Sequence, residues 1–189
     1  MQPIIKSRFE QFSDGVFAIA ITLLAIELRA PEVVSHDIVR AVRDLAPFAP
    51  SIATFVTSFV TIAIFWVNHH QLTALLQKIT QRRILWANVL FLLFVTLIPF
   101  VTQALSYDPF NSTRMIGYCL VLLGGSISFS LLRYFIHRSL GETDIPMRRS
   151  AFGPIVYLLA AFVALVSVTA CYILVAIPAL YYFLPKSSS

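Results

Sequence analysis

The stretch RFEQFSDGVFAIAITLLAIEL, from Arg8 to Leu28, decides the fold class of this chain. Its first residues are charged or polar, and then Gly15 to Ile26 carries no charge at all. A run of roughly 20 apolar residues is long enough to cross the hydrocarbon core of a bilayer as one helix. The stretch therefore predicts a membrane-spanning helix. The entrance of this helix carries Arg8, Glu10, Ser13 and Asp14.

The composition extends this prediction to the whole chain. Hydrophobic residues make up 58% of the 189 residues, charged residues make up 12%, and the mean hydropathy is +0.82. These values lie well outside the averages of soluble proteins. The 14 lysines and arginines are scattered between apolar segments, which is typical of topology signals and not of a nucleic acid surface. We therefore expect an integral membrane protein whose surroundings are the lipid bilayer, with no nucleic acid partner.

The apolar segments divide residues 1–189 into a single all-α domain with six predicted transmembrane helices. The first four are predicted at about Phe9–Leu28, Ala46–Trp66, Ile84–Leu105 and Met115–Ile136. In the fourth, Gly124 and Gly125 would permit close helix packing. The uncharged block Ala151–Leu184 is too long for one comfortable span, so we interpret it as two helices of about 16 residues with a turn near the sequence SVTAC.

The distribution of basic residues predicts the orientation in the cell membrane. With a cytoplasmic N-terminus and six spans, ten basic residues fall in cytoplasmic segments: Lys6, Arg8, Lys78, Arg82, Arg83, Arg133, Arg138, Arg148, Arg149 and Lys186. Only four fall in outer segments: Arg29, Arg40, Arg43 and Arg114. The positive-inside rule favours this arrangement, which places both termini in the cytoplasm.

The sequence contains no recognisable catalytic pattern. It has no Ser-His-Asp set, glycine-rich phosphate loop or HExxH stretch, so we expect neither an enzyme nor a cofactor. The neighbours His69 and His70 would diverge by about 100° on a helix and would not readily ligate one metal ion. We favour two interfacial histidines bonded to neighbouring groups. The potassium filter sequence TVGYG is also absent, which excludes a channel of that kind.

The first predicted helix has two different faces when its residues are placed at 100° intervals. One face, from about 340° to about 80°, carries branched or aromatic apolar residues and one hydroxyl. Its members are Ile26, Ile19, Phe12, Leu23 and Thr22. Ser13 and Asp14 fall on the other side, at about 160° and about 260°, so we expect their polar groups to face neighbouring helices of the same bundle.

Asp14 is the charged residue closest to the uninterrupted apolar sequence. One interpretation is an ordinary acid at a helix start, which the helix dipole favours. A carboxylate at this depth is costly unless it is paired, however, so it is also a candidate for a functional or structural site. Four side chains could donate a hydrogen bond to it: Arg8, His69, His70 and the indole of Trp66.

Arg8, followed by Phe12-Ser13-Asp14 at RxxxFSD spacing and by GVFAIAITLL, resembles the first-helix signature of the transmembrane protein 175 family of potassium channels. The segment FWVNHH, from Phe65 to His70, also resembles the end of that family's second helix. The resemblance covers the layout of the whole chain, and its most specific part is Arg8 to Leu24. It implies one six-helix unit per chain, assembled as a homotetramer.

This resemblance implies that the first helices of four subunits line a central pore for potassium and other monovalent cations. The constriction would fall on Ile19, with further apolar layers at Leu23 and Ile26 and a hydroxyl layer at Thr22. The motif would hold the first helix against its neighbours. Eight residues would take part, from both helices: Arg8, Phe12, Ser13, Asp14, Trp66, Asn68, His69 and His70. A hydrophobic ring gates by dewetting, and we expect a leak-type channel with a modest preference for potassium over sodium.

Two other classes of function stay open at this level. A secondary transporter would usually show repeated halves around a site at the bilayer midplane, and residues 1–95 show no convincing repeat in residues 96–189. A non-conducting membrane scaffold would need no pore, and a stripe of isoleucine and leucine facing lipid would look much the same as a pore stripe.

Overall fold

The computed structural model describes residues 6–28, 43, 46–77, 81–142 and 147–183. This part of the chain is entirely helical, with six long helices and one short 3-10 turn, which confirms the predicted all-α membrane fold. The elements are α1 (Lys6–Glu27), η1 (Ala46–Phe48), α3 (Ala49–Ala74), α4 (Arg82–Tyr107), α5 (Ser112–Ser139), α6 (Met147–Val163) and α7 (Val168–Phe183).

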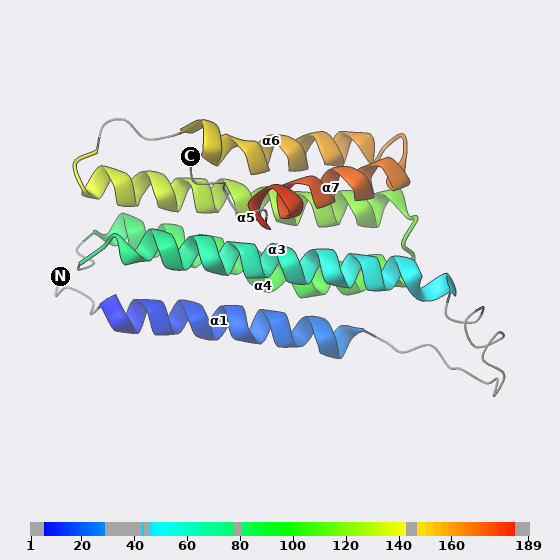
Figure 1. Cartoon of the computed structure of the whole chain (residues 1–189), viewed down its shortest axis with the longest axis horizontal. Helices are drawn as coiled ribbons and strands as arrows, with labels where there is room; N and C mark the ends of the chain where they lie inside the picture. The colour runs from blue at the N-terminus through cyan, green and yellow to red at the C-terminus, as the bar shows by residue number, and fades with distance from the viewer. Residues whose placement is uncertain (1–5, 29–42, 44–45, 78–80, 143–146, 184–189) are drawn as a thin grey trace.

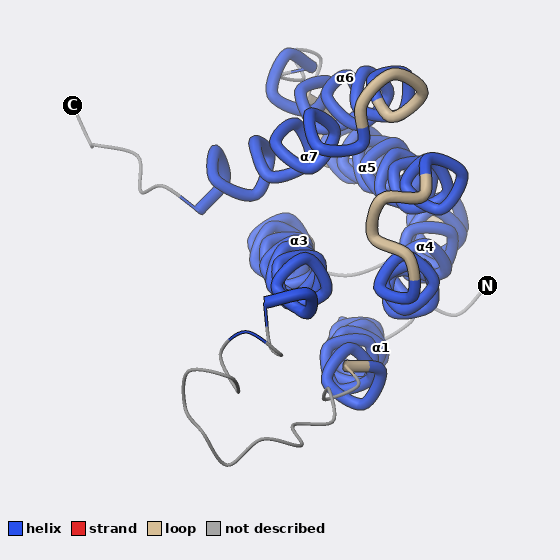
Figure 2. Tube along the Cα trace, turned by 90° about the vertical axis from the view of Figure 1, so that its right-hand side faces the viewer, coloured by secondary structure: helices blue, strands red, loops and turns tan. Residues whose placement is uncertain are grey.

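The six helices lie side by side along the long axis of the molecule (Figure 1). Seen from the end, α1 stands at one edge of the bundle beside α3 and α4, and α6 stands on the far side (Figure 2). The helix α5 packs mainly against α4 and α6, and α7 packs against α6 and α3. Among the described elements, α1 packs mainly against α3 and α4, and several of its large side chains are exposed.

Local sequence signals explain where several helices begin and end. Pro50 stands in the first turn of α3, where a missing amide proton costs no helical hydrogen bond. The Asn111 side chain accepts a hydrogen bond from the Arg114 amide at 3.2 Å and caps the start of α5. Gly141 follows the end of α5 with a φ of 82°, a left-handed conformation that favours glycine at this position.

Four helices, α1, α3, α4 and α5, are long and apolar enough to cross a membrane. The predicted division of the last apolar block is also confirmed, because α6 and α7 contain 17 and 16 residues. The turn between them covers residues 164–167 and ends where SVTAC begins. The Ser167 hydroxyl oxygen accepts a hydrogen bond from the Ala170 amide at 3.3 Å and so caps α7.

The helix α3 continues to Ala74, beyond the end predicted for the second membrane span at about Trp66. The sequence after Trp66 is polar, which suggested an exit from the membrane. In the structure His69, Leu72 and Thr73 are buried and continue the inner face of α3. Polar side chains that find partners inside the bundle therefore extend the helix beyond its apolar segment. The other predicted ends of the first four helices lie within three residues of those observed.

An aromatic cluster fills the centre of the bundle between α3, α4 and α5. The Phe91 side chain is fully buried there. Its ring centroid lies 5.3 Å from Phe65 in an edge-to-face arrangement and 5.1 Å from Phe129. Such ring pairs stabilise a packed interior beyond the area that they bury. This cluster fixes α3, against which α1 is then placed.

The close packing expected at Gly124 and Gly125 is confirmed on the α4 side of α5. A β-carbon added at Gly124 would run into the ring of Phe94, and one added at Gly125 would lie 3.4 Å from the ring of Phe65. Small residues at helix interfaces are a common way for membrane helices to approach closely. Gly124 therefore permits the close approach of α4 to α5, whereas a β-carbon at Gly125 would make only ordinary contacts with Phe65 of α3 and Phe94 of α4.

We expect Gly124→Val to destabilise the protein, by about 1 to 3 kcal/mol, because the Phe94 ring must leave its position. Gly117→Val is the matched control on the same helix, since a β-carbon there meets nothing within 4 Å. Size-exclusion chromatography after heating gives the melting temperature of each detergent-purified variant. Equal melting temperatures for the two variants would contradict the packing described for Gly124.

Candidate functional site on the first helix

The helix α1 has one buried face and one exposed face. Phe9, Ser13, Phe17, Ala20 and Leu24 are almost completely buried against α3 and α4, at the spacing of one helical face. Four large apolar side chains lie on the other side and are between 38% and 75% exposed: Phe12, Ile19, Leu23 and Ile26. The structure therefore brings together on one uncovered face the apolar residues that the helical pattern had grouped.

Thr22 lies on the exposed face of α1 beside Ile19. Its hydroxyl donates a hydrogen bond to the Ile19 carbonyl at 2.9 Å, three residues back on the same helix. Such a bond is common for threonine in a helix. The hydroxyl oxygen still has lone pairs that can accept from water or contact a cation. Thr22 is thus placed to offer one oxygen per chain on an otherwise apolar face.

On the buried face, Ser13 takes part in a chain of hydrogen bonds that joins three helices. The Ser13 hydroxyl donates to the Phe9 carbonyl at 3.0 Å and accepts from Asn88 Nδ2 at 3.0 Å. Asn88 Oδ1 lies 2.8 Å from His69 Nε2. Because Asn88 Nδ2 is the donor to Ser13, Asn88 Oδ1 is the acceptor and His69 Nε2 carries the hydrogen. We call Ser13, Asn88 and His69 the buried polar triad.

Aromatic rings enclose the buried polar triad. The His69 ring lies 5.6 Å from Phe17, 6.0 Å from Phe91 and 6.2 Å from Phe9, measured between centroids. All three members of the triad are at most 1% exposed. Hydrogen bonds in such a dry environment are strong, and a member left without its partner would be costly. The triad therefore ties α1 to α3 and α4 in one register.

Asp14 forms a second tie between α1 and α3. Its Oδ1 accepts a hydrogen bond from the Trp66 indole at 2.9 Å. Of the four donors that the sequence offered, the structure pairs Asp14 with the indole. Arg8 and Asp14 are both exposed in the single chain. Near the same end, Lys6 Nζ donates to the Ala74 carbonyl at 3.4 Å, so the start of α1 is fastened to the end of α3.

The two adjacent histidines point in different directions, as their sequence position required. His69 is buried in the triad, whereas His70 is exposed and stacks on the Trp66 ring with centroids 6.1 Å apart. His69 is therefore bonded to a neighbouring side chain inside the bundle, and His70 is stacked on one at the surface of the single chain. The described residues contain no cluster of three or more His, Cys, Asp or Glu side chains that could hold a metal ion.

The structure does not bring Asn68 to this cluster. Its Nδ2 donates to the Ile64 carbonyl of its own helix at 2.8 Å, and its side chain lines a pocket between α3 and α5 to α7. Asn88, in contrast, was missed from the sequence although it connects all three helices. The available signal was an amide with apolar residues on both sides in a predicted span, which is expensive unless it is bonded.

The helices and buried contacts together define a class of protein. The chain is an all-helical membrane protein in which buried polar contacts hold one helix at the edge of the bundle. The opposite face of that helix presents branched apolar side chains and one hydroxyl, which are exposed in the single chain. Polar residues inside membrane helices are rare and usually belong to an ion or substrate pathway or to the frame that supports it.

Comparison with known proteins agrees with this class. The family model described as endosomal/lysosomal potassium channel TMEM175 matches residues 8–99, which contain most of α1, all of α3, the buried polar triad and the Asp14–Trp66 contact. A potassium channel of Chamaesiphon minutus is 34% identical over 175 residues, which is 85% of each chain. A potassium channel of Streptomyces collinus is 32% identical over 191 residues, covering 94% of this chain and 91% of the relative.

The fold comparison is equally extensive. The crystal structure of a lysosomal potassium-selective channel TMEM175 homolog from Chamaesiphon minutus matches with a TM-score of 0.82 and 33% sequence identity. The match covers 97% of this chain and 98% of that one. The chain therefore belongs to the TMEM175 family of ion channels, as its first-helix signature indicated. It is a membrane channel protein and not an enzyme.

Proposed function

We propose that four copies of this chain form a potassium-permeable, leak-type cation channel in the cell membrane, with α1 of each copy lining a central pore. One observation carries the proposal. The face of α1 that holds Ile19, Thr22, Leu23 and Ile26 is uncovered in the single chain, while its opposite face is fixed by buried polar contacts. A helix held in this way can present a defined ring of side chains when four copies meet around an axis.

In this arrangement Ile19 forms the narrowest ring, and Leu23 and Ile26 form apolar layers on its outer side. Such a ring opposes conduction because water leaves a narrow apolar neck readily. Potassium holds its hydration shell less tightly than sodium, so it loses water at the neck at a lower cost. The Thr22 hydroxyls replace part of that water next to the neck. Together these features favour potassium, but only modestly.

The related proteins support this proposal through their names, since both bacterial relatives are called potassium channels. The other classes left open by the sequence are a secondary transporter and a non-conducting scaffold. Neither would require a fixed helix with an uncovered stripe of branched side chains and a hydroxyl. Recordings from purified protein in planar lipid bilayers separate the three. Our proposal requires unitary potassium currents, and their absence from verified tetramers would leave only the other two.

We expect Thr22→Val to lower the preference for potassium over sodium while leaving fold and assembly unchanged, because valine keeps the shape and removes the oxygen. The reversal potential under opposed potassium and sodium gradients measures the preference. Thr57→Val is the matched control, since Thr57 is a half-buried threonine of α3 that donates a hydrogen bond to a carbonyl of its own helix at 2.8 Å. A potassium preference that is the same in both variants and the wild type would remove Thr22 from the pathway.

The orientation proposed for the channel also has a direct test. The ends of α1, α4 and α5 that carry Lys6, Arg82 and Arg138 lie together at one end of the bundle (Figure 1), which supports a cytoplasmic position for that end. We expect a membrane-impermeant thiol reagent to label Ser112→Cys in intact cells and to miss Arg148→Cys. The native Cys119 and Cys171 are fully buried and give a low background. The reverse labelling pattern would contradict this topology.

A further inference from the structure

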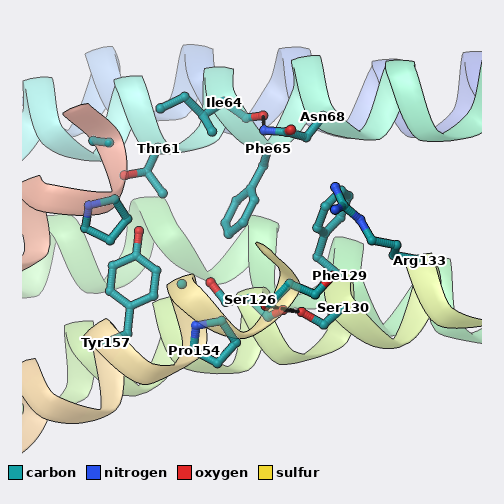
Figure 3. Close-up of a pocket in the computed structure, with 14 residues that line it drawn as sticks. Thr61, Ile64, Phe65, Asn68, Ser126, Phe129, Ser130, Arg133, Pro154 and Tyr157 are labelled. Atoms are coloured by element: carbon teal, nitrogen blue, oxygen red, sulfur yellow. Dashed lines mark hydrogen bonds between the residues drawn. The ribbon is translucent and has the colours of Figure 1, made fainter. Parts of the chain in front are cut away.

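A pocket opens between α3, α5, α6 and α7, separate from the exposed face of α1 (Figure 3). Its volume is about 530 Å³ when the open solvent at its mouth is counted, so the enclosed part is smaller. Neither the buried polar triad nor the proposed pore stripe contributes a residue to it. The proposed channel function therefore leaves this pocket without a role.

One end of the pocket is polar and positively charged. Figure 3 shows the Arg133 side chain of α5 reaching toward Asn68 of α3 at this end. The Arg133 guanidinium lies 5.5 Å from the centroid of the Phe129 ring, in cation–π contact. Ser150, in the first turns of α6, also lines this pocket, and its buried hydroxyl has no hydrogen-bond partner among the described residues. A cationic donor and an unused hydroxyl thus face one space.

The remainder of the pocket is mainly apolar. Ile64 and Phe65 of α3, Pro154 of α6 and Ala179 of α7 supply most of this wall, and Tyr157 lies at the far end from Arg133 in Figure 3. The pocket therefore has the polarity of an amphiphile, with a charged end and a hydrocarbon-like body. The charged end suits an anionic group, and the apolar part suits a hydrocarbon chain.

We propose that this pocket binds an anionic phospholipid, with the phosphate at Arg133 and the Ser150 hydroxyl and one acyl chain along the apolar wall. Guanidinium groups bind phosphate oxygens through strong, paired hydrogen bonds. Arg133 also lies toward the end of the bundle that carries Arg138 and Arg82, so the local field attracts anionic headgroups. Basic pockets between transmembrane helices are known sites for anionic lipid headgroups. Lipid binding at this pocket can be measured whether or not the protein conducts ions.

The test measures lipid binding to the full-length protein in a neutral detergent. Phosphatidylglycerol, added as the anionic probe, raises the melting temperature of the wild type and is retained in native mass spectra, whereas phosphatidylcholine does neither. Arg133→Gln weakens phosphatidylglycerol binding about tenfold or more, the loss expected for a charge-assisted hydrogen bond. Arg138→Gln is the matched control, since Arg138 is an exposed arginine of the same helix that does not line the pocket.

A second variant tests the apolar wall without changing the charge. Ile64→Trp fills the pocket beside Phe65 and weakens phosphatidylglycerol binding while Arg133 remains in place. Soluble glycerol 3-phosphate, which has the headgroup chemistry but no acyl chain, binds neither protein. Equal binding of phosphatidylglycerol and phosphatidylcholine to the wild type would overturn the proposal without any variant. Undiminished phosphatidylglycerol binding to Arg133→Gln, or equal binding of glycerol 3-phosphate, would also overturn it.

Discussion

Ile19→Asn is expected to raise the unitary conductance several-fold and to reduce the discrimination between potassium and sodium. The Ile19 side chain is 60% exposed in the single chain, so an amide there costs the fold of the subunit little. In the proposed pore, four amides would replace four isoleucine side chains at the narrowest ring. They would hold water in the neck, and the barrier that arises from dewetting would fall. Planar-bilayer recordings in symmetric and opposed cation solutions measure both quantities.

The matched control for this substitution is Ile155→Asn, which places the same amide on α6. Ile155 is 55% exposed, similar to Ile19, but belongs to α6, which stands on the opposite side of the bundle from α1 (Figure 2). We expect this change to alter stability in the membrane and to leave unitary conductance as in the wild type. If Ile19→Asn conducts no differently from Ile155→Asn, the narrowest ring does not contain Ile19.

Asn88→Leu is expected to have the largest effect on folding and assembly. Leucine has a similar size but can neither donate to Ser13 nor accept from His69, whose hydrogen bonds to Asn88 are 3.0 Å and 2.8 Å long. Each buried group left without a partner costs about 1 to 3 kcal/mol. The start of α1 would lose its register against α3 and α4, and the yield of assembled oligomer would fall. Size-exclusion chromatography with light scattering measures that yield.

Asn68→Leu is the matched control, because Asn68 bonds only to a carbonyl of its own helix among the described contacts. We expect it to assemble nearly as well as the wild type. Asp14→Ala should lie between the two, since it removes the bond from the Trp66 indole at a more exposed position. Normal assembly of Asn88→Leu would show that the buried polar triad does not hold α1 in place.

The sequence predicted the helices well because each long apolar segment has only one stable form in a bilayer. A segment such as Ile84–Leu105 must satisfy its backbone hydrogen bonds internally, so length and polarity almost determine the helix. The helix α3 extends past the predicted span end at Trp66, through residues that are not apolar. His69 and Thr73 are polar, yet both are buried in the bundle, where His69 bonds to Asn88 of α4 and Thr73 bonds to the His70 carbonyl of its own helix. Only the packing of other helices reveals that such polar residues continue a helix.

The part of the candidate site that lies within one helix could be predicted from the sequence. The contacts between different helices were harder to predict. Ser13 and the apolar stripe follow from the spacing within α1, and the structure places them on opposite faces. The choice of Trp66 as partner for Asp14, and of Asn88 for Ser13, depends on how α3 and α4 pack beside α1. Asn68 and Asn88 are both amides near apolar residues, and the local sequence does not distinguish the one that joins the triad.

The role of the α1 stripe as a pore lining is the central claim, and a charged thiol reagent tests it most directly. Ile26→Cys places a thiol where the native side chain is 75% exposed, and Leu24→Cys places one where it is 1% exposed. The native cysteines are buried, so the wild type should not respond. A positively charged methanethiosulfonate, added during single-channel recording, should reduce the potassium current of Ile26→Cys and leave that of Leu24→Cys unchanged. An unchanged current in Ile26→Cys that carries the modification would contradict the account.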